Sequence, residues 1–407
     1  MKTRNIVGPI PEPDELYGRD DLIGYLWKQI AGCNILLLAP RRFGKSGIMR
    51  HVLMKPQPGF LPLDFELEDV TTPEEFVWRV TGKLLAQDAL RSVLSKARHL
   101  PAGVHDWVKE TFDAVEFEGA KVKFKDSIKE EWAKAATRLI LEMEKADPAV
   151  VFIFDEFPTM IENLTAKCGA SVAVEFLGWF RKIRLEHKDV LRRHRFLVAG
   201  SIGIDTVLRK LGVPDKFNDF HRIFVEPLAA MAARQLVRDL AETHDIAWND
   251  SLETELFSLL GVHVPYFIQL FFSQLGQLPQ ATRQALTVEE LRRIYKDRVL
   301  GPTCKDYFQH YSMRLQRLGK AGEKAAVAIL RSVAGSPTGR LSRSALFDIY
   351  SKARGRGATD LEFDTLLGDL EHDWYLVLDP NTNEYHFLVK VMRDWWCRWY
   401  PPAVRKP

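Results

Sequence analysis

The sequence predicts an α/β protein with a parallel sheet, followed by an all-helical region and a small C-terminal domain. Short continuous apolar runs alternate with helical patterns over residues 30–227, and such runs are typical of strands buried on both faces of a parallel sheet. Strand signals stop after Pro227, and from Gly322 three helical segments precede two short strands. We therefore expect three domains, over residues 1–227, 228–318 and 319–407.

The sheet is predicted from five apolar segments, at residues 34–39, 60–67, 150–155, 195–199 and 222–225. Helices are expected between them, at residues 20–30, 44–54, 72–97, 127–146 and 171–187. The helix at 72–97 has the clearest start, because Thr72 is a good cap and Pro73 suits the first helical position. Residues 100–125 contain Pro101 and two glycines, and we expect them to be an excursion from the sheet.

Residues 228–315 are expected to form several helices, broken at Gly261, Pro265, Pro279 and Pro302. Further helices are predicted at residues 322–334, 342–352 and 361–373, and strands at 375–379 and 384–388. Three helices and a β-hairpin in this order indicate a winged helix-turn-helix domain.

The composition is that of an ordinary soluble protein of the cytoplasm. Hydrophobic residues make up 46% and charged residues 27% of 407, which excludes global disorder, and the net charge of +3 excludes a bulk attraction to nucleic acid. The four cysteines lack zinc-ribbon or redox spacing, so we expect reduced thiols. The N-terminus does not resemble a signal peptide, and every apolar run is far shorter than the roughly 20 residues of a membrane span.

The segment Ala39-Pro40-Arg41-Arg42-Phe43-Gly44-Lys45-Ser46 has the form of a P-loop, with Ala39 in place of the first glycine. It lies between a predicted strand and a predicted helix, which is the context that the motif requires. In such a loop backbone N–H groups wrap a phosphate chain, Lys45 contacts the β- and γ-phosphates and Ser46 binds Mg²⁺. The sequence thus predicts a site for ATP or ADP with Mg²⁺, with contacts from Ala39, Pro40, Arg41, Arg42, Phe43, Gly44, Lys45, Ser46 and Gly47.

Two carboxylates follow the predicted strand at 150–155, where ligands bind in open α/β sheets. Asp155 is expected to hold Mg²⁺ and Glu156 to polarise the attacking water. Because consecutive strand residues point to opposite faces, we expect their roles to separate. Together with the P-loop, this pair indicates hydrolysis as well as binding.

Two further residues have open alternatives. Ser201 follows the strand at 195–199, where it would contact the γ-phosphate or the attacking water, or would be a turn serine. Arg222 begins the last predicted strand, where it would complete the site of a neighbouring subunit as an arginine finger, or would form a surface salt bridge.

These segments resemble an archaeal-type ATPase of the STAND group, within the AAA+ ATPases, along nearly the whole chain. The resemblance implies that Tyr17, Gly18 and Arg19 belong to a box leading into the adenine pocket, and that Pro265 contacts the base from a helical lid. It also implies a Walker B segment at Asp155–Glu156, a sensor 1 at Gly200-Ser201 and an aromatic C-terminal end at Trp395-Trp396. One departure is His263, where the family usually has a glycine.

Charge patterning bears on the partners. Residues 181–210 hold nine basic and three acidic side chains, which fits a phosphate-binding surface or, alternatively, a solvated helix and turn. The predicted recognition helix at 359–373 has six acids and no Lys or Arg, so we expect it to stay out of the major groove. Its domain would instead pack on the ATPase core or a protein partner.

Three functions remain in competition. The first is a Mg²⁺-dependent ATPase switch whose nucleotide state controls contacts with a protein partner or with other copies of the chain. The second is a DNA-associated ATPase, similar to origin-recognition or transposition loaders, and the third is a nucleotide-binding protein with little turnover. Glu156 argues against the third, because a pure binder does not need a water-polarising acid.

Overall fold

The chain consists of two compact units in the computed structural model, which describes residues 3–88, 90, 132–186, 191, 193–200, 203–355 and 357–401. The sheet unit comprises residues 21–39 and 48–224. The helical unit comprises residues 1–20, 40–47 and 225–407, so the P-loop segment belongs to it. The expected excursion at 100–125 lies outside the described residues.

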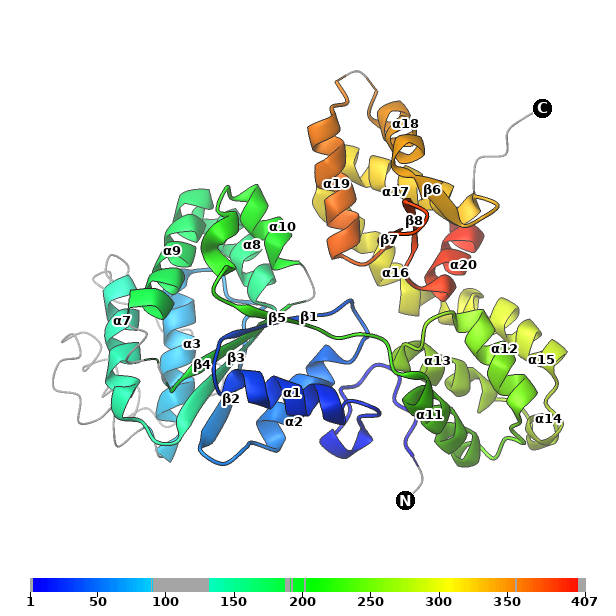
Figure 1. Ribbon diagram of the computed structural model, residues 1–407, viewed down its shortest axis with the longest axis horizontal. Helices are drawn as coiled ribbons and strands as arrows, with labels where there is room; N and C mark the ends of the chain where they lie inside the picture. Colours follow the sequence, from blue (N-terminus) through cyan, green and yellow to red (C-terminus); the bar gives the residue numbers. More distant parts are fainter. Residues whose placement is uncertain are drawn as a thin grey trace. The chain divides into compact units, whose positions relative to one another are not determined.

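The sheet unit contains the predicted parallel sheet (Figure 1). Its strands are β1 (Ile35–Leu38), β2 (Phe60–Glu66), β3 (Ala149–Asp155), β4 (Arg195–Ala199) and β5 (His221–Phe224). All pairs are parallel, and the order across the sheet is β2-β3-β4-β1-β5. Strand β4 therefore lies between β1, which leads into the P-loop, and β3, which ends in the two carboxylates.

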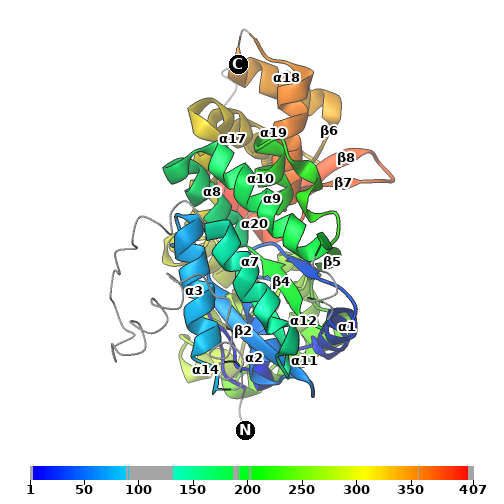
Figure 2. The same ribbon diagram turned by 90° about the vertical axis from the view of Figure 1, so that its left-hand side faces the viewer.

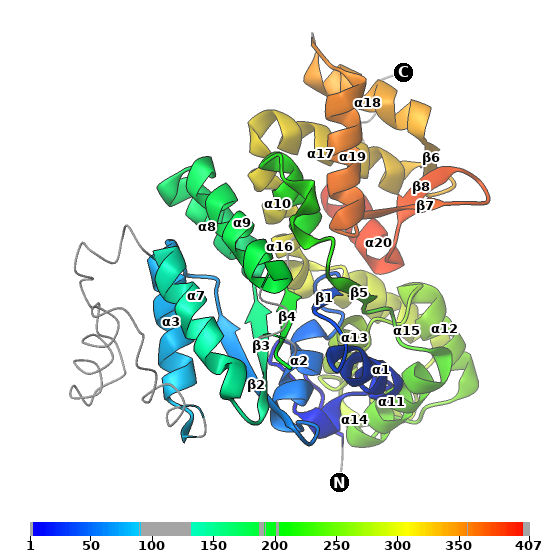
Figure 3. The ribbon, with the colours of Figure 1, turned by 60° about the vertical axis from the view of Figure 1, so that its left-hand side comes forward.

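Alternating strand residues fill two hydrophobic layers. Leu36, Phe152, Phe154 and Phe196 belong to one buried cluster, together with side chains of the helices on that face. Figure 2 looks onto this layer, formed by α3 (Pro73–Leu85), α7 (Trp132–Glu142), α8 (Phe157–Cys168) and α9 (Ala170–Glu186), with the sheet behind it. On the opposite face lie α1 (Asp20–Ile30) and α2 (Lys45–Met54) (Figure 3).

Each of the five helical segments predicted in the sheet unit contains a helix, whereas the helices at Phe157–Cys168 and Ile204–Lys210 were not predicted. The described helices of this unit are α1 (Asp20–Ile30), α2 (Lys45–Met54), α3 (Pro73–Leu85), α7 (Trp132–Glu142), α8 (Phe157–Cys168), α9 (Ala170–Glu186) and α10 (Ile204–Lys210), with 3₁₀ turns η2 (Met143–Lys145) and η4 (Pro214–Phe217). Thr72 caps α3 as predicted, because its side chain accepts a hydrogen bond from the Glu75 N–H. No helix in the described part of the chain is long and apolar enough to cross a membrane.

The first part of the helical unit is all-helical. It contains α11 (Ala230–Thr243), α12 (Asp250–Leu260), α13 (Pro265–Leu275), α14 (Gln280–Gln284), α15 (Val288–Ile294) and α16 (Lys305–Arg314), joined by the short turns η5 (Tyr295–Val299), η6 (Pro302–Cys304) and η7 (Leu315–Leu318). Pro265 opens α13 as its first residue, where a missing N–H costs no helical hydrogen bond.

The N-terminal arm, residues 3–16, packs on these helices and ends in the turn η1 (Pro13–Glu15). The backbone N–H of Ile6 donates to the Gln269 side chain at 2.6 Å, and the side chains of Asn5 and His244 hydrogen-bond at 3.1 Å. Ile6 is buried. The arm thus ties residues that are more than 230 positions apart.

The C-terminal part contains three helices and a small antiparallel sheet. The elements are α17 (Gly319–Gly335), β6 (Arg340–Ser342), α18 (Arg343–Arg354), α19 (Asp360–His372), β7 (Leu376–Asp379), β8 (Glu384–Phe387) and α20 (Lys390–Trp399), with the strand order β6-β8-β7. Strand β6 was not predicted, because it is only three residues long and pairs with β8 far along the chain.

Helix α20 attaches this part to the preceding helices through aromatic side chains. Trp395 and Trp396 are buried, and the Trp395 ring stacks on Phe308 of α16 at 5.8 Å between centroids. The Trp399 indole N–H donates to the Leu300 carbonyl at 3.0 Å. These aromatics therefore anchor α20 on neighbouring helices of the same unit.

Candidate functional site

The P-loop turns directly from β1 into α2 through left-handed backbone. Arg42 has a φ of 72° and Gly44 a φ of 92°. A Cβ built on Gly44 meets nothing within 4 Å, so open space faces the backbone at this point. Lys45, the first residue of α2, is only 9% exposed. A loop of this kind, ending at the N-terminus of a ten-residue helix, presents N–H groups and a positive dipole to an anion, so the residues present fit a phosphate chain.

Arg19 supports the P-loop from the N-terminal box. Its guanidinium is buried and donates a hydrogen bond to the Phe43 carbonyl at 3.1 Å. Burial lowers the pKa of Arg19 to about 10, an effect that the charge of Glu226 opposes, so the group stays cationic at neutral pH. The structure thus places the predicted nucleotide contact Arg19 against the backbone of the loop.

Tyr17 and Gly18, of the segment at residues 17–19, pack against α11. The Tyr17 hydroxyl donates to the Asp239 carboxylate at 2.8 Å, and burial raises the pKa of Tyr17 to about 12. Gly18 has a φ of 56°, and a Cβ on it would lie 2.3 Å from the Cβ of Ala232. Only glycine fits this close approach without movement of α11.

The N-terminal arm packs closely against Gly47 at the start of α2. A Cβ on Gly47 would lie 2.8 Å from Leu16 and 2.9 Å from Pro11. Gly47 is therefore required for the N-terminal arm to pack against the P-loop. The predicted nucleotide contact of Gly47 stays a prediction, and the structure adds this packing role.

The two P-loop arginines face the helices of the helical unit. The Arg42 guanidinium lies over the Tyr266 ring at 4.5 Å from its centroid, a cation–π contact next to Pro265. The Tyr311 hydroxyl donates a long hydrogen bond, 3.4 Å, to the Arg41 carbonyl. Neither contact was foreseen, because both partners come from helices more than 200 residues away.

At the end of β3 the backbone changes direction between the two carboxylates. Glu156 has left-handed backbone, with φ 53° and ψ 28°, and stands at the cap of α8. The premise of strand alternation is therefore wrong, because Glu156 lies outside the strand, while the separate roles of the two carboxylates stay a prediction. The Glu156 carboxylate accepts a hydrogen bond from the Thr159 hydroxyl at 3.0 Å, and its N–H donates to Asp155 at 2.9 Å.

A non-glycine residue in left-handed backbone is costly, by roughly 1–3 kcal/mol, and such residues cluster at functional sites. The strain at Glu156 follows a buried strand whose last residue is Asp155. The left-handed backbone at Glu156 therefore supports a functional role for the two carboxylates, and this support does not depend on the sequence motif.

The two remaining catalytic predictions have different outcomes. Ser201 lies outside the described residues. Arg222 lies within β5, and its guanidinium donates two hydrogen bonds of 2.7 Å to the Asp205 carboxylate. The structure thus contains the salt bridge that the sequence analysis held as the alternative, and the arginine-finger role stays a prediction.

The described arginines of the basic stretch 181–210 are engaged within the sheet unit. Arg184 is buried and forms an ion pair with Asp219 at 2.7 Å, and Arg181 pairs with Asp215. Arg193 pairs with Asp147 at 2.7 Å. These contacts favour the structural interpretation of the stretch over a phosphate-binding surface.

Acids of α19 form ion pairs with the two arginines of α18. Arg343 pairs with Asp360 at 3.5 Å and also with Asp364, and Arg354 pairs with Glu362 at 3.0 Å. The opposite face of α19 is buried through Phe363, Leu366, Leu367 and Leu370, as its spacing predicted.

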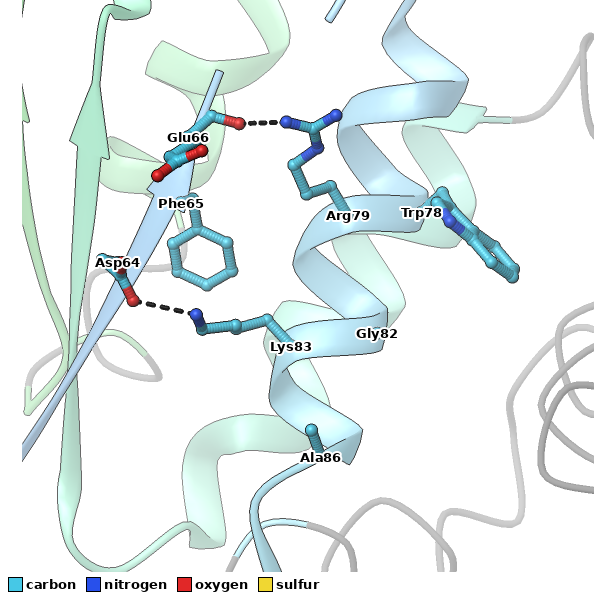
Figure 4. A pocket seen from close by; sticks show the side chains of 8 residues that line it. All are labelled: Asp64, Phe65, Glu66, Trp78, Arg79, Gly82, Lys83 and Ala86. Atoms are coloured by element: carbon cyan, nitrogen blue, oxygen red, sulfur yellow. Dashed lines mark hydrogen bonds and ion pairs between the residues drawn. The ribbon is translucent and has the colours of Figure 1, made fainter. Parts of the chain in front are cut away.

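One hollow that the sequence did not indicate lies between β2 and α3 (Figure 4). Its volume is about 510 Å³. Lys83 pairs across it with Asp64 at 2.8 Å, and Arg79 pairs with Asp69 at 2.6 Å, so both cations are already matched by acids. The remaining lining residues are Phe65, Glu66, Trp78, Gly82 and Ala86.

Comparisons with known proteins bear on the fold. No protein-family model and no curated protein matches the sequence. A solved Walker-type ATPase of Pyrococcus abyssi is similar with a TM-score of 0.62 at 14% identity, over 96% of this chain and 99% of that one. The ORC2 protein of Aeropyrum pernix, solved as ADPNP–ADP complexes, is similar with a TM-score of 0.54 at 12% identity, over 96% and 97%. The chain therefore has the fold of a P-loop ATPase along almost its entire length.

Proposed function

We propose that this protein is a Mg²⁺-dependent ATPase of the STAND/AAA+ type, whose nucleotide state controls contacts with a protein partner or with other copies of the chain. One observation carries the proposal. Lys45 is buried at the first turn of α2, directly after the left-handed Gly44, which is the arrangement that a phosphate-binding loop needs.

The residues divide into binding and hydrolytic roles. The P-loop N–H groups and Lys45 bind the phosphates. Ser46 and Asp155 would hold Mg²⁺, which neutralises phosphate charge when bound. Glu156 orients and polarises the attacking water. Tyr17, Gly18, Arg19 and Pro265 are proposed to form the base pocket.

Ser201 and Arg222 are proposed as accessory groups, Ser201 as the sensor near the γ-phosphate and Arg222 as an arginine supplied to a neighbouring subunit. The Arg222 proposal requires that its salt bridge with Asp205 opens on assembly. It predicts that turnover per chain rises with protein concentration in the wild type but not in Arg222→Ala. A rate independent of concentration in both proteins argues against the finger role.

We further propose three domains, an ATPase core (1–227), a helical lid (228–318) and a winged-helix domain (319–407), in a cytoplasmic protein. The antiparallel β6-β8-β7 sheet beside α17, α18 and α19 supports the winged-helix assignment. The burial of Trp395 and its stacking on Phe308 of the preceding helices support a packing role for this domain.

The decisive experiment is nucleotide binding by Lys45→Ala. Loss of a charge-assisted contact costs about 1.5–3 kcal/mol, so we expect a roughly 10- to 100-fold loss of ATP affinity in titration calorimetry. Lys83→Ala is the matched control, since Lys83 pairs with Asp64 on the sheet unit and should leave the affinity unchanged. Unaltered ATP affinity in a folded Lys45→Ala protein would sink the proposal.

The alternative is a DNA-associated ATPase. The similarity to the Aeropyrum pernix ORC2 fold supports it. The sequence of residues 359–373 argues against major-groove recognition by α19, because it offers no Lys or Arg to DNA phosphates and its acids repel them. DNA affinity measured against salt, with and without ATP, distinguishes the two. A tight, sequence-specific complex that Glu362→Lys abolishes would establish the alternative.

A further inference from the structure

Strand β2 lies at one side of the parallel sheet, with β3 as its single hydrogen-bonded neighbour among the described strands. The Gly59 carbonyl accepts the Ala149 N–H at 2.9 Å, so the backbone groups of Gly59 point toward β3. The direction of these groups alternates along a strand, so every second residue of β2 points its N–H and C=O away from β3, at the free edge of β2. The residues that do so are Phe60, Pro62, Asp64 and Glu66.

Four backbone groups in a row are open on this free edge. They are the Pro62 carbonyl, the N–H and carbonyl of Asp64, and the Glu66 N–H, and none has a hydrogen-bond partner in the part of the chain that the structure describes. Arg79 donates to the next group, the Glu66 carbonyl, and so closes the end of the edge. A strand laid beside β2 can pair with all four groups, whether it runs parallel or antiparallel.

The side chains on the free edge restrict what can pair with it. Proline and charge are the usual protection of an edge strand, and β2 has both, in Pro62, Asp64 and Glu66. Lys83 pairs with Asp64 at 2.8 Å, whereas Glu66 is exposed and has no ion-pair partner among the described residues. A second copy of β2 would bring its own acids to this edge, and like charges opposite one another destabilise a strand pair. The charge of the edge therefore favours a basic partner.

The hollow between β2 and α3 adjoins the free edge (Figure 4). Gly82 and Ala86, which have little or no side chain, line its volume of about 510 Å³, and Phe65 is its apolar wall on the strand. In Figure 4 the Phe65 ring lies between Lys83 and Arg79, which contact β2 on either side of it. The hollow therefore has room for an apolar side chain beside the open backbone groups.

The two faces of the edge specify the side chains of a strand that pairs with it. Successive side chains of β2 point to opposite faces, so Asp64 and Glu66 share one face and Phe65 is on the other. Side chains of an added strand alternate in the same way. Those beside the two carboxylates stabilise the pair when they are basic, and those beside Phe65 when they are apolar. The complementary sequence thus alternates basic with apolar residues.

We propose that the free edge of β2 binds an extended peptide of a partner protein in which basic and apolar residues alternate. The peptide adds a strand to the sheet, with its backbone bonded to residues 62–66, its basic side chains beside Asp64 and Glu66, and an apolar side chain in the hollow. Strands β3 and β4 separate this edge from β1, which leads into the P-loop. The peptide site is therefore distinct from the proposed nucleotide site.

The first test measures binding of short labelled peptides to the full-length protein by fluorescence anisotropy. The probe is acetyl-Lys-Val-Lys-Val-Lys-amide, and the control has glutamate in place of each lysine. We expect the lysine peptide to bind, and the glutamate peptide to bind at least about tenfold more weakly, because its charges repel those of the edge. No binding of the lysine peptide, or equal binding of both, overturns the proposal.

Backbone methylation separates strand pairing from simple charge attraction. Only every second N–H of an added strand faces β2, so the lysine peptide is made in two versions, methylated on the nitrogens of the valines or of the central lysine. One version should lose at least about tenfold in affinity, because it loses a hydrogen bond to β2, while the other stays within about threefold of the probe. Equal affinities of the two versions contradict strand addition.

Charge reversal locates the peptide on the edge. Glu66→Lys replaces attraction by repulsion, so the lysine peptide should bind roughly 2- to 30-fold more weakly and the glutamate peptide more tightly. Glu68→Lys makes the same charge change two residues beyond the end of β2, and this matched control should keep the wild-type preference. Equal effects of the two substitutions, or no effect of Glu66→Lys, overturn the assignment.

Hydrogen exchange locates the peptide independently and also detects other occupants. The amides of Asp64 and Glu66 should exchange quickly in the protein alone and slowly with the lysine peptide. Unchanged exchange contradicts binding at this edge. Slow exchange without any peptide means that another copy or another part of the chain already fills the edge, which also overturns the proposal.

Discussion

Polar residues at the amino ends of the parallel strands, the amino edge of the sheet, have different surroundings from those at the carboxyl ends, the carboxyl edge. At the amino edge, Asn34 accepts the Phe196 N–H with its side chain at 3.0 Å and the His221 N–H with its carbonyl at 2.8 Å. His194 accepts the Val150 N–H at Nδ1 and meets the Met143 carbonyl at Nε2. Both side chains accept hydrogen bonds from the strand backbone, and neither residue has a positive φ.

At the carboxyl edge, charged residues and residues with left-handed backbone follow the strands. Left-handed residues follow both β1, at Arg42 and Gly44, and β3, at Glu156. A fold can hold such conformations only where the surrounding structure enforces them. The difference indicates that polar residues at the amino edge stabilise the sheet, whereas the carboxyl edge is where ligands bind in other open α/β sheets.

The largest expected effect is on turnover at the carboxyl edge. Glu156→Gln keeps the size of the side chain but removes its basicity, so kcat should fall by about 10²–10⁴-fold while ATP affinity is retained. Steady-state phosphate release and a separate binding titration measure the two quantities. Glu162→Gln, one turn and a half further along α8, serves as the control and should turn over at the wild-type rate. Wild-type turnover in Glu156→Gln would mean that another group is the base.

Gly44→Ala sharpens the comparison at the other strand end. Alanine is strained at a φ of 92°, by roughly 1–3 kcal/mol, and the loop should bind ATP about tenfold or more weakly. Gly24→Ala in α1 is the matched control, because Gly24 has no neighbour within 4 Å of a built Cβ and no positive φ. We expect this control to be neutral or slightly stabilising. Equal ATP affinities in the two variants would contradict phosphate binding by the backbone of the P-loop.

At the amino edge the expected effect is on stability alone. Asn34→Ala leaves the Phe196 N–H without its acceptor, which should lower the free energy of unfolding by about 1–3 kcal/mol. Urea titration measures this change, and the ATP affinity of the folded fraction should match the wild type. A large loss of ATP affinity without a stability change would break the distinction between the two edges.

The smallest effect is a pH dependence at His194. Burial lowers the pKa of His194, so it stays neutral in the fold while the unfolded chain binds a proton below its ordinary value of 6.5. The unfolded state then binds more protons, and stability falls as the pH drops from about 6.5. Unfolding free energies at pH 7.5 and 5.5 should differ less in His194→Gln than in the wild type. Identical differences would show that other groups set the pH dependence.

Much of the sheet could be predicted from the sequence because buried strands have a strong local signal. The strand at 195–199 was predicted at its observed residues, and β1, β2, β3 and β5 lie within one residue of their predicted ends. The strand order was not predictable, because five similar apolar runs do not encode which neighbour each one takes. The short β6 was missed for the same reason, since its identity depends on pairing with β8.

At the site, the loop and the strand-end acids were recognisable because their function requires particular residues at fixed spacing. Sequence reasoning failed at Glu156, where it extended strand alternation by one residue into a left-handed turn. It also missed Tyr311, because a tyrosine near the end of an unremarkable helix has no local signature. Its hydrogen bond to the Arg41 carbonyl joins residues 270 positions apart in the chain.

The N-terminal arm has a mechanical consequence. A force applied at the N-terminus would first peel away four contacts, those of Thr3 with Tyr17 and Thr243, of Asn5 with His244 and of Ile6 with Gln269. The arm residues Thr3, Asn5 and Ile6 precede the first helix, so their contacts would be lost one after another. Gly47 would then lose the Pro11 and Leu16 side chains that pack against it. A tether fixed to the N-terminus would therefore act on the P-loop before it unravels any part of the sheet.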